Sequence, residues 1–131
     1  MPPDNAATVS PGSPVEFPQD GPISASATIT RLSSSSFNLA AIGTYYISFQ
    51  VSVTEAGQLI LELNGADLAY TVVGRATGTS QIMETAIITT TSVNSILRVL
   101  NPAGESTALT ITPLAGGTRP VSAHLVIMRI E

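Results

Sequence analysis

Residues 43–53 (GTYYISFQVSV) alternate between two kinds of side chain. Apolar side chains fall on one parity and polar side chains fill most of the other; the apolar set is Tyr45, Ile47, Phe49, Val51 and Val53. Successive side chains of a β-strand point to opposite faces, so this alternation predicts a strand with one apolar and one mostly polar face. The segment is therefore expected to be a core strand.

Further short strands are expected from residue 23 to the end of the chain. Asn64-Gly65 lies between two apolar runs, which is a strong hairpin signal because both residues accept positive φ. A helix is the alternative over residues 81–100, but β-branched side chains dominate there and favour strands. Strands spaced by about 8–12 residues are typical of a sandwich or jelly roll, so we predict an all-β fold.

The first 22 residues differ from the rest because they carry six of the nine prolines. Proline fixes φ and removes a backbone donor, so residues 1–22 are expected to form an extended or disordered arm rather than a packed element. The stretch VEF at 15–17 is the one part expected to add a short edge strand. The predicted division is an arm over 1–22 and a single domain over 23–131.

Charge and composition exclude several classes of function. The 131 residues carry a net charge of −4, with five scattered arginines and no lysine, so no basic footprint for nucleic acid is present. No apolar run approaches a membrane span, and we expect no membrane insertion. The absence of cysteine excludes disulfides, thiol nucleophiles and cysteine zinc sites. A charged fraction of only 11% with many hydroxyl side chains fits a secreted or surface-assembly protein.

Candidate catalytic groups are sparse. His124 is the only histidine, and Ser122 lies two residues before it at strand spacing, but no G-x-S-x-G elbow is present. Glu62 and Asp67 flank the Asn64-Gly65 turn and would come close, yet exposed carboxylates beside a hairpin are more often solvated surface. We therefore expect no enzyme and no catalytic residues.

Metal, cofactor and ligand signals are equally weak. No loop has the converging acids of a calcium site, so no metal is expected. The stretch LAGGTRP has the glycines of a phosphate cradle, but no helix is expected after it, so no cofactor is expected either. Tyr46 and Tyr70 are candidate carbohydrate platforms, although packing inside the domain or between subunits is the favoured interpretation.

Four segments together resemble a known family. These are GTYYISFQVSV, LILELNGADL, METAIITTTSVNSILRVLN and SAHLVIMRIE, in this order. Over residues 15–131 the chain resembles the C1q/TNF-like superfamily, and within it the C-terminal domain of BclA-type collagen-like exosporium glycoproteins of spore-forming bacteria. The sequence lacks Gly-X-Y repeats, and it has no counterpart of the calcium-binding acids of some C1q-like proteins.

The resemblance implies a jelly-roll β-sandwich of two antiparallel sheets that forms a homotrimer at the tip of a collagen-like stalk. It implies a non-enzymatic trimerisation and surface-display domain, extracellular or on the spore surface (the exosporium), as an excerpt of a longer chain. Surface glycans or host receptors are further candidate partners. The alternative is a carbohydrate- or receptor-binding β-sandwich, such as a phage-tail tip.

The closing segment HLVIMRI supports association independently, because it is apolar on both parities. A strand that is apolar on both faces is expected to be covered on both, and a neighbouring subunit is the simplest second cover. We assign Tyr46, Leu125 and Ile127 to the trimer interface, with the reverse assignment of the two faces of the closing strand as the alternative, because both of its faces are apolar. The core is expected to contain Tyr45, Phe49, Val51, Val126 and Met128.

Overall fold

The computed structural model describes residues 8–78, 80–112, 114–119 and 123–131. The fold is all-β, as predicted, with one short 3-10 turn, η1 (Ala69–Thr71). The strands are β1 (Thr8–Val9), β2 (Ile29–Arg31), β3 (Phe37–Leu39), β4 (Thr44–Val53), β5 (Gly57–Leu63), β6 (Ala66–Asp67), β7 (Val73–Arg75), β8 (Ser80–Thr89), β9 (Ser95–Leu100), β10 (Leu109–Thr110) and β11 (His124–Arg129).

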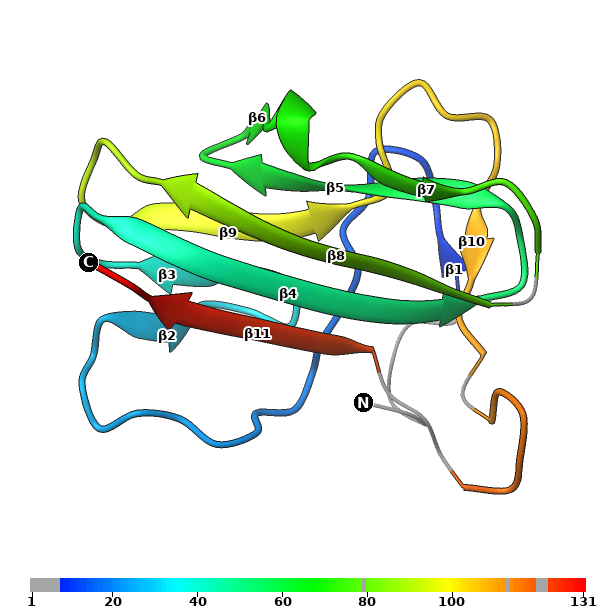
Figure 1. The fold of residues 1–131 in the computed structure, drawn as a ribbon, viewed down its shortest axis with the longest axis horizontal. Coiled ribbons are helices and arrows are strands. Elements are labelled where there is room, and N and C mark those ends of the chain that lie inside the picture. Colours follow the sequence, from blue (N-terminus) through cyan, green and yellow to red (C-terminus); the bar gives the residue numbers. More distant parts are fainter. Residues whose placement is uncertain (1–7, 79, 113, 120–122) are drawn as a thin grey trace.

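Two antiparallel sheets form the body of the molecule (Figure 1). One has the order β11-β4-β8, and the other has the order β2-β3-β9-β5-β6, with β7 also paired to β5. The short strands β1 and β10 pair with each other. Side chains from both large sheets meet in one hydrophobic cluster, so the two sheets are the layers of a sandwich.

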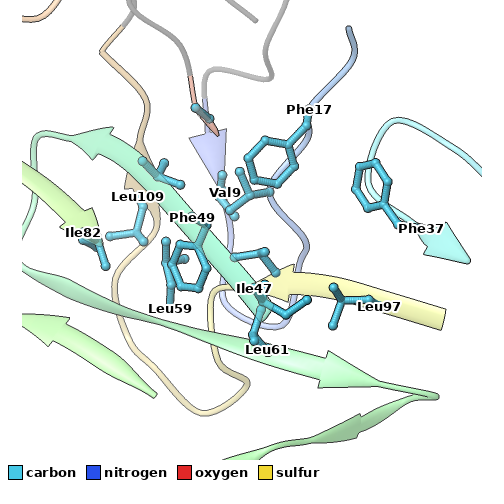
Figure 2. Close-up of a cluster of buried hydrophobic side chains, with 14 of the residues drawn as sticks. Val9, Phe17, Phe37, Ile47, Phe49, Leu59, Leu61, Ile82, Leu97 and Leu109 are labelled. Atoms are coloured by element: carbon cyan, nitrogen blue, oxygen red, sulfur yellow. The ribbon is translucent and has the colours of Figure 1, made fainter. Parts of the chain in front are cut away.

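Strand β4 confirms the alternation that the sequence predicts. Tyr45, Ile47, Phe49 and Val51 are all buried, whereas the residues between them are partly exposed. Figure 2 shows Phe49 and Ile47 among side chains of the facing sheet, including Leu59, Leu61 and Leu97. The apolar parity of β4 therefore faces the core, and the other parity forms the outside of the sandwich.

The predicted hairpin after β5 is also present. Asn64 and Gly65 have φ values of 54° and 80°, and they connect β5 to β6. A type of turn that requires positive φ favours asparagine and glycine, which explains the choice of residues. The alternative of a helix over 81–100 is wrong, because β8 and β9 lie there.

Residues 8–17 do not behave as an unpacked arm. Val9, Val15 and Phe17 are buried members of the core cluster, and the backbone N–H of Val15 donates to the carbonyl of Val99. The proline count was misleading because proline removes donors without preventing its neighbours from packing. The expected boundary at residue 22 therefore fails for this stretch, and residues 1–7 lie outside the described residues.

Candidate functional site

The candidate catalytic residues do not form a site in the described part of the chain. His124 is exposed at the start of β11, opposite Gln50 of β4. Ser122 lies outside the described residues. The glycines of LAGGTRP that are described lie in turns, and the next described element is a strand. No group of three or more metal-binding side chains occurs among the described residues.

Glu62 and Asp67 are directly opposite each other on β5 and β6, as the hairpin predicts. Glu62, however, is 7% exposed and accepts a hydrogen bond from the Nε of Arg98 at 2.6 Å. This hydrogen bond, with the charge of Glu62, raises the pKa of the Arg98 guanidinium. Asp67 is exposed. The Glu62 carboxylate thus fixes β5 to β9, which leaves no free pair of acids at this turn.

The outer face of the β11-β4-β8 sheet carries a group of exposed apolar side chains. The strand register sets Met128, Tyr46 and Ile87 side by side in one row across the sheet. The next rows are Val126 with Ser48 and Thr85, and then His124 with Gln50 and Met83. Val126, Met128, Met83 and Ile87 are 47–59% exposed. We call Tyr46, Met83, Ile87, Val126 and Met128 the outer apolar patch.

The outer face is nearly free of charge. Within β4, β8 and β11, the described residues whose side chains point to this face include no lysine, arginine, aspartate or glutamate. They are Thr44, Tyr46, Ser48, Gln50, Ser52, Gln81, Met83, Thr85, Ile87, Thr89, His124, Val126 and Met128. The cores of protein interfaces are likewise depleted of charged residues and enriched in tyrosine and methionine. This surface is the best candidate functional site of the described chain.

The face assignment expected for the closing strand is wrong. Val126 and Met128 do not fill the core; they are exposed on the outer face. Leu125 and Ile127 instead pack, partly buried, against the core cluster, so they do not share a face with Tyr46. The sequence could not choose between these faces because both are apolar. Met83 and Ile87 were missed, and only the register with β4 brings them beside Tyr46.

A hollow of about 600 Å³ lies at one end of the outer face. Ser52, Gln81 and Met83 of the sheet line one part of it, and the loop residues Thr112, Ala115 and Gly116 line another. The outer apolar patch therefore borders a concave surface at Met83. A protruding side chain of a partner protein could pack into this hollow.

Strand β8 carries a carboxylate on its inner face. Glu84 lies opposite the buried Phe49, between Ile82 and Ala86, and removal from water raises the pKa of its carboxyl group. The sequence pattern did not predict that the side chain of Glu84 points inward. An inward-pointing charge on an edge strand opposes the addition of a further strand, because pairing would enclose the charge.

Glu55 differs from Glu84, because the pKa of its carboxyl group is lowered rather than raised. It lies in the connection between β4 and β5. Its carboxylate accepts hydrogen bonds from the backbone N–H of Thr110 at 2.7 Å and from the Thr110 hydroxyl at 2.8 Å. Desolvation is the largest single influence and raises the pKa of the Glu55 carboxyl, but the hydrogen bonds from Thr110, Thr54 and the Glu55 backbone together outweigh it, and the pKa lies below the ordinary 4.5.

This geometry predicts a pH-dependent contribution to stability. A carboxyl group with a lowered folded-state pKa stabilises the protein above its unfolded pKa, and the contribution is lost as pH falls through the folded value. We expect Glu55→Gln to lower the melting temperature at neutral pH and to lose this effect as acidification takes the pH through the lowered folded-state pKa of Glu55. Glu105→Gln, at an exposed loop position, is the matched control. A Glu55→Gln deficit that is constant with pH would contradict the expectation.

No family model matches the sequence, and no curated protein matches it. Among the described residues, no helix is long and apolar enough to cross a membrane.

Proposed function

We propose that this domain is a non-enzymatic module that assembles into a homotrimer and displays a surface at the distal tip of a collagen-like bacterial protein. The observation that supports association is the uncharged outer face with its apolar patch. The jelly-roll topology, the trimeric state and the position at the spore surface follow the family resemblance of the four sequence segments.

Burial of the outer apolar patch provides a driving force for association. Full burial of a Val, Ile or Met side chain contributes about 1.5–3 kcal/mol. The four aliphatic and thioether side chains of the patch are already about half buried, so each contributes about 1 kcal/mol on association. In a ring of three copies each contribution recurs three times, about 12 kcal/mol in all, which offsets a large part of the cost of bringing the copies together, about 4–15 kcal/mol for each association step.

A cyclic trimer requires two different surfaces on each copy, because its interfaces are heterologous. The outer apolar patch is one of these surfaces. Tyr70 and Val72 are 67% and 44% exposed in the segment that connects β6 to β7, and β7 lies alongside the edge strand β8 (Figure 1). We assign this pair to the second surface, which places the edge of one copy against the outer face of the next.

The mass of the protein in solution tests the proposal. Sedimentation equilibrium at micromolar concentration is expected to give three times the chain mass of 13.5 kDa. A single species at the chain mass would refute the trimer. A dimer would also refute it, because two copies need a self-complementary interface rather than a ring.

The alternative function is a carbohydrate- or receptor-binding sandwich. The exposed ring of Tyr70 favours it, since sugars stack on accessible aromatic faces and Tyr70 is not buried inside the domain. A glycan array separates the two functions: specific binding that Tyr70→Ala removes without changing the mass would support the alternative. A folded trimer with no glycan hits would support the display module.

A further inference from the structure

Strand β11 has one unpaired edge. It forms its ladder with β4 alone and ends the β11-β4-β8 sheet. On an edge strand every second residue directs its N–H and C=O groups away from the sheet, where they form a template for another strand. The short length of β11 does not remove this template, since six residues, His124–Arg129, have strand geometry.

The free edge of β11 borders a groove of about 910 Å³. Leu125 and Ile127 line one side of the groove, and Phe17, Ile29 and Phe37 line the other. These apolar side chains come from both layers of the sandwich, so the groove is the gap at which the two sheets remain open. A strand with apolar side chains on one face would fill this gap.

A segment of the same chain borders the groove without pairing. Residues 21–24 and residue 26 line it together with β11. No backbone–backbone hydrogen bond involves residues 21–27 in the described part of the chain, and Ile23 is 65% exposed. Unpaired backbone therefore faces an unpaired strand edge across a groove whose lining is apolar on the β11 side at Leu125 and Ile127 and includes the charged Asp20 and Arg31.

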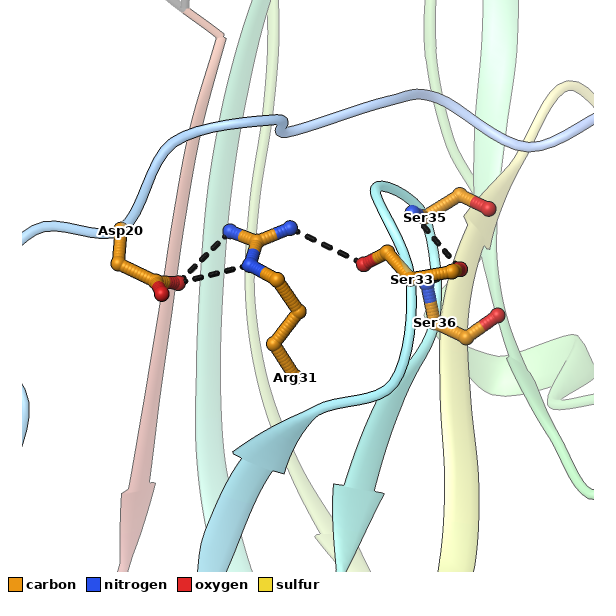
Figure 3. Close-up of polar contacts among 5 residues, drawn as sticks. All are labelled: Asp20, Arg31, Ser33, Ser35 and Ser36. Carbon is orange, nitrogen blue, oxygen red and sulfur yellow. Dashed lines mark hydrogen bonds and ion pairs between the residues drawn. The ribbon is translucent and has the colours of Figure 1, made fainter.

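The segment is held at both of its ends. Asp20 accepts a hydrogen bond from the Nε of Arg31 of β2 at 2.9 Å, and the Nη2 of Arg31 forms an ion pair with the same carboxylate oxygen at 2.8 Å (Figure 3). At the other end, the carbonyl of Thr28 accepts a hydrogen bond from the backbone N–H of Ala40 at 2.8 Å. The eight residues 21–28 thus span two fixed points and remain near the groove, which lowers the entropic cost of closing.

The sequence of the segment has the period of a strand. Ile23, Ala25 and Ala27 share the parity of Ile29, which already faces the groove, and Ser24, Ser26 and Thr28 occupy the other parity. Only the end of this alternating run, Ile29–Arg31, is a strand in the structure. The pattern predicts a longer strand than the one that is formed.

The two ends of the β11-β4-β8 sheet differ in a way that favours β11 as the acceptor. At the β8 end, Glu84 points inward and β7 lies alongside. At the β11 end, Leu125 and Ile127 point inward and no charged side chain occurs on the inner face between residues 124 and 128. Along residues 124–128 the β11 edge can therefore accept a strand without enclosing a charge of its own sheet, whereas the β8 edge cannot. Arg129, the last residue of β11, has the inward parity but lies beyond this stretch.

We propose that residues 23–27 form a further strand on the free edge of β11 and close the sandwich. In the structure Ser24 and Ser26 line the groove together with Ile23. In the closed form Ile23 and Ala25 enter the groove beside Leu125 and Ile127, and the two serines turn to the outside. The backbone groups of both segments then pair with each other instead of with water. This closure involves the edge and the groove, and it does not depend on the outer face or on a trimer.

Hydrogen exchange of the full chain tests the closure directly. Amides of residues 23–27 are expected to exchange about tenfold or more slowly than the same peptide when unstructured. Exchange at the rate of the unstructured peptide would overturn the proposal. Protection that disappears on dilution would also overturn it, because the added strand would then belong to a second copy.

A pair of substitutions tests the role of Ile23 separately. Ile23→Asp is expected to lower the melting temperature by several degrees and to remove the protection of residues 23–27. Leu32→Asp is the matched control, since Leu32 is 55% exposed and does not line the groove, and it is expected to change neither quantity. Equal, small effects of the two substitutions would show that Ile23 stays in solvent and would overturn the proposal.

Discussion

Phe49→Asp is expected to leave the chain unfolded at room temperature. The Phe49 side chain is 1% exposed at the centre of β4, among residues of both sheets (Figure 2). The substitution removes a large apolar side chain, which costs about 3–5 kcal/mol, and it adds a carboxylate that must be desolvated. Glu84 lies directly opposite, so the new charge would also repel an existing one. The sum approaches the whole stability of a small domain, about 5–15 kcal/mol.

Circular dichroism and the dispersion of the amide NMR signals measure this outcome. Gln58→Asp places a carboxylate at an exposed position of β5 and is expected to keep the native signals. Phe49→Leu retains an apolar side chain and is expected to fold with a lower melting temperature. A native spectrum for Phe49→Asp would mean that the inner face of β4 is more accessible to water than its burial indicates.

Met128→Asp is expected to convert the proposed trimer into folded monomers. Met128 is 54% exposed in the outer row with Tyr46 and Ile87, and it does not contribute to the core. A carboxylate there would be desolvated in each of three interfaces without a cation on the outer face to pair with it. Removing one partner-facing contact and adding an unpaired charge costs several kcal/mol per interface.

Ile96→Asp is the matched control for Met128→Asp. Ile96 is 40% exposed on β9, on the outside of the other sheet. Sedimentation equilibrium is expected to show a chain-mass species for Met128→Asp and the unchanged trimer for Ile96→Asp. If both proteins remained trimeric, the outer apolar patch would not be the interface, whereas two monomeric proteins would show that the interface includes the second sheet.

The sequence predicted best where one face of a strand is apolar and the other is polar. The bounds and the inward face of β4 follow from its alternation, and the positive φ of Asn64 and Gly65 follows from the hairpin pattern. The run ADLAYTVVG follows the hairpin turn, and its apolar residues on their own are compatible with a single returning strand. It is divided into β6, η1 and β7, because the Thr71 hydroxyl accepts a hydrogen bond from the backbone N–H of Leu61 in place of a ladder partner.

Three features could not be predicted, each for a physical reason. The core positions of Val9 and Phe17 depend on contacts with distant strands, which local proline content does not report. The direction of Leu125 depends on the register with β4, since both faces of β11 are apolar. The outer apolar patch depends on the order β11-β4-β8, which brings together side chains from three separate segments. Its use as a trimer interface stays a prediction.

The inward carboxylate of Glu84 also limits how this protein can polymerise. A cross-β filament elongates only if each incoming chain leaves a fresh hydrogen-bonding edge for the next one. At the β8 end of the β11-β4-β8 sheet, Glu84 opposes the addition of another chain, because the added strand would remove water from the charged carboxylate. Growth of this sheet in two directions is therefore blocked at neutral pH. Acidification neutralises the Glu84 carboxyl group, so strands are expected to add at the β8 end of the sheet only at acidic pH.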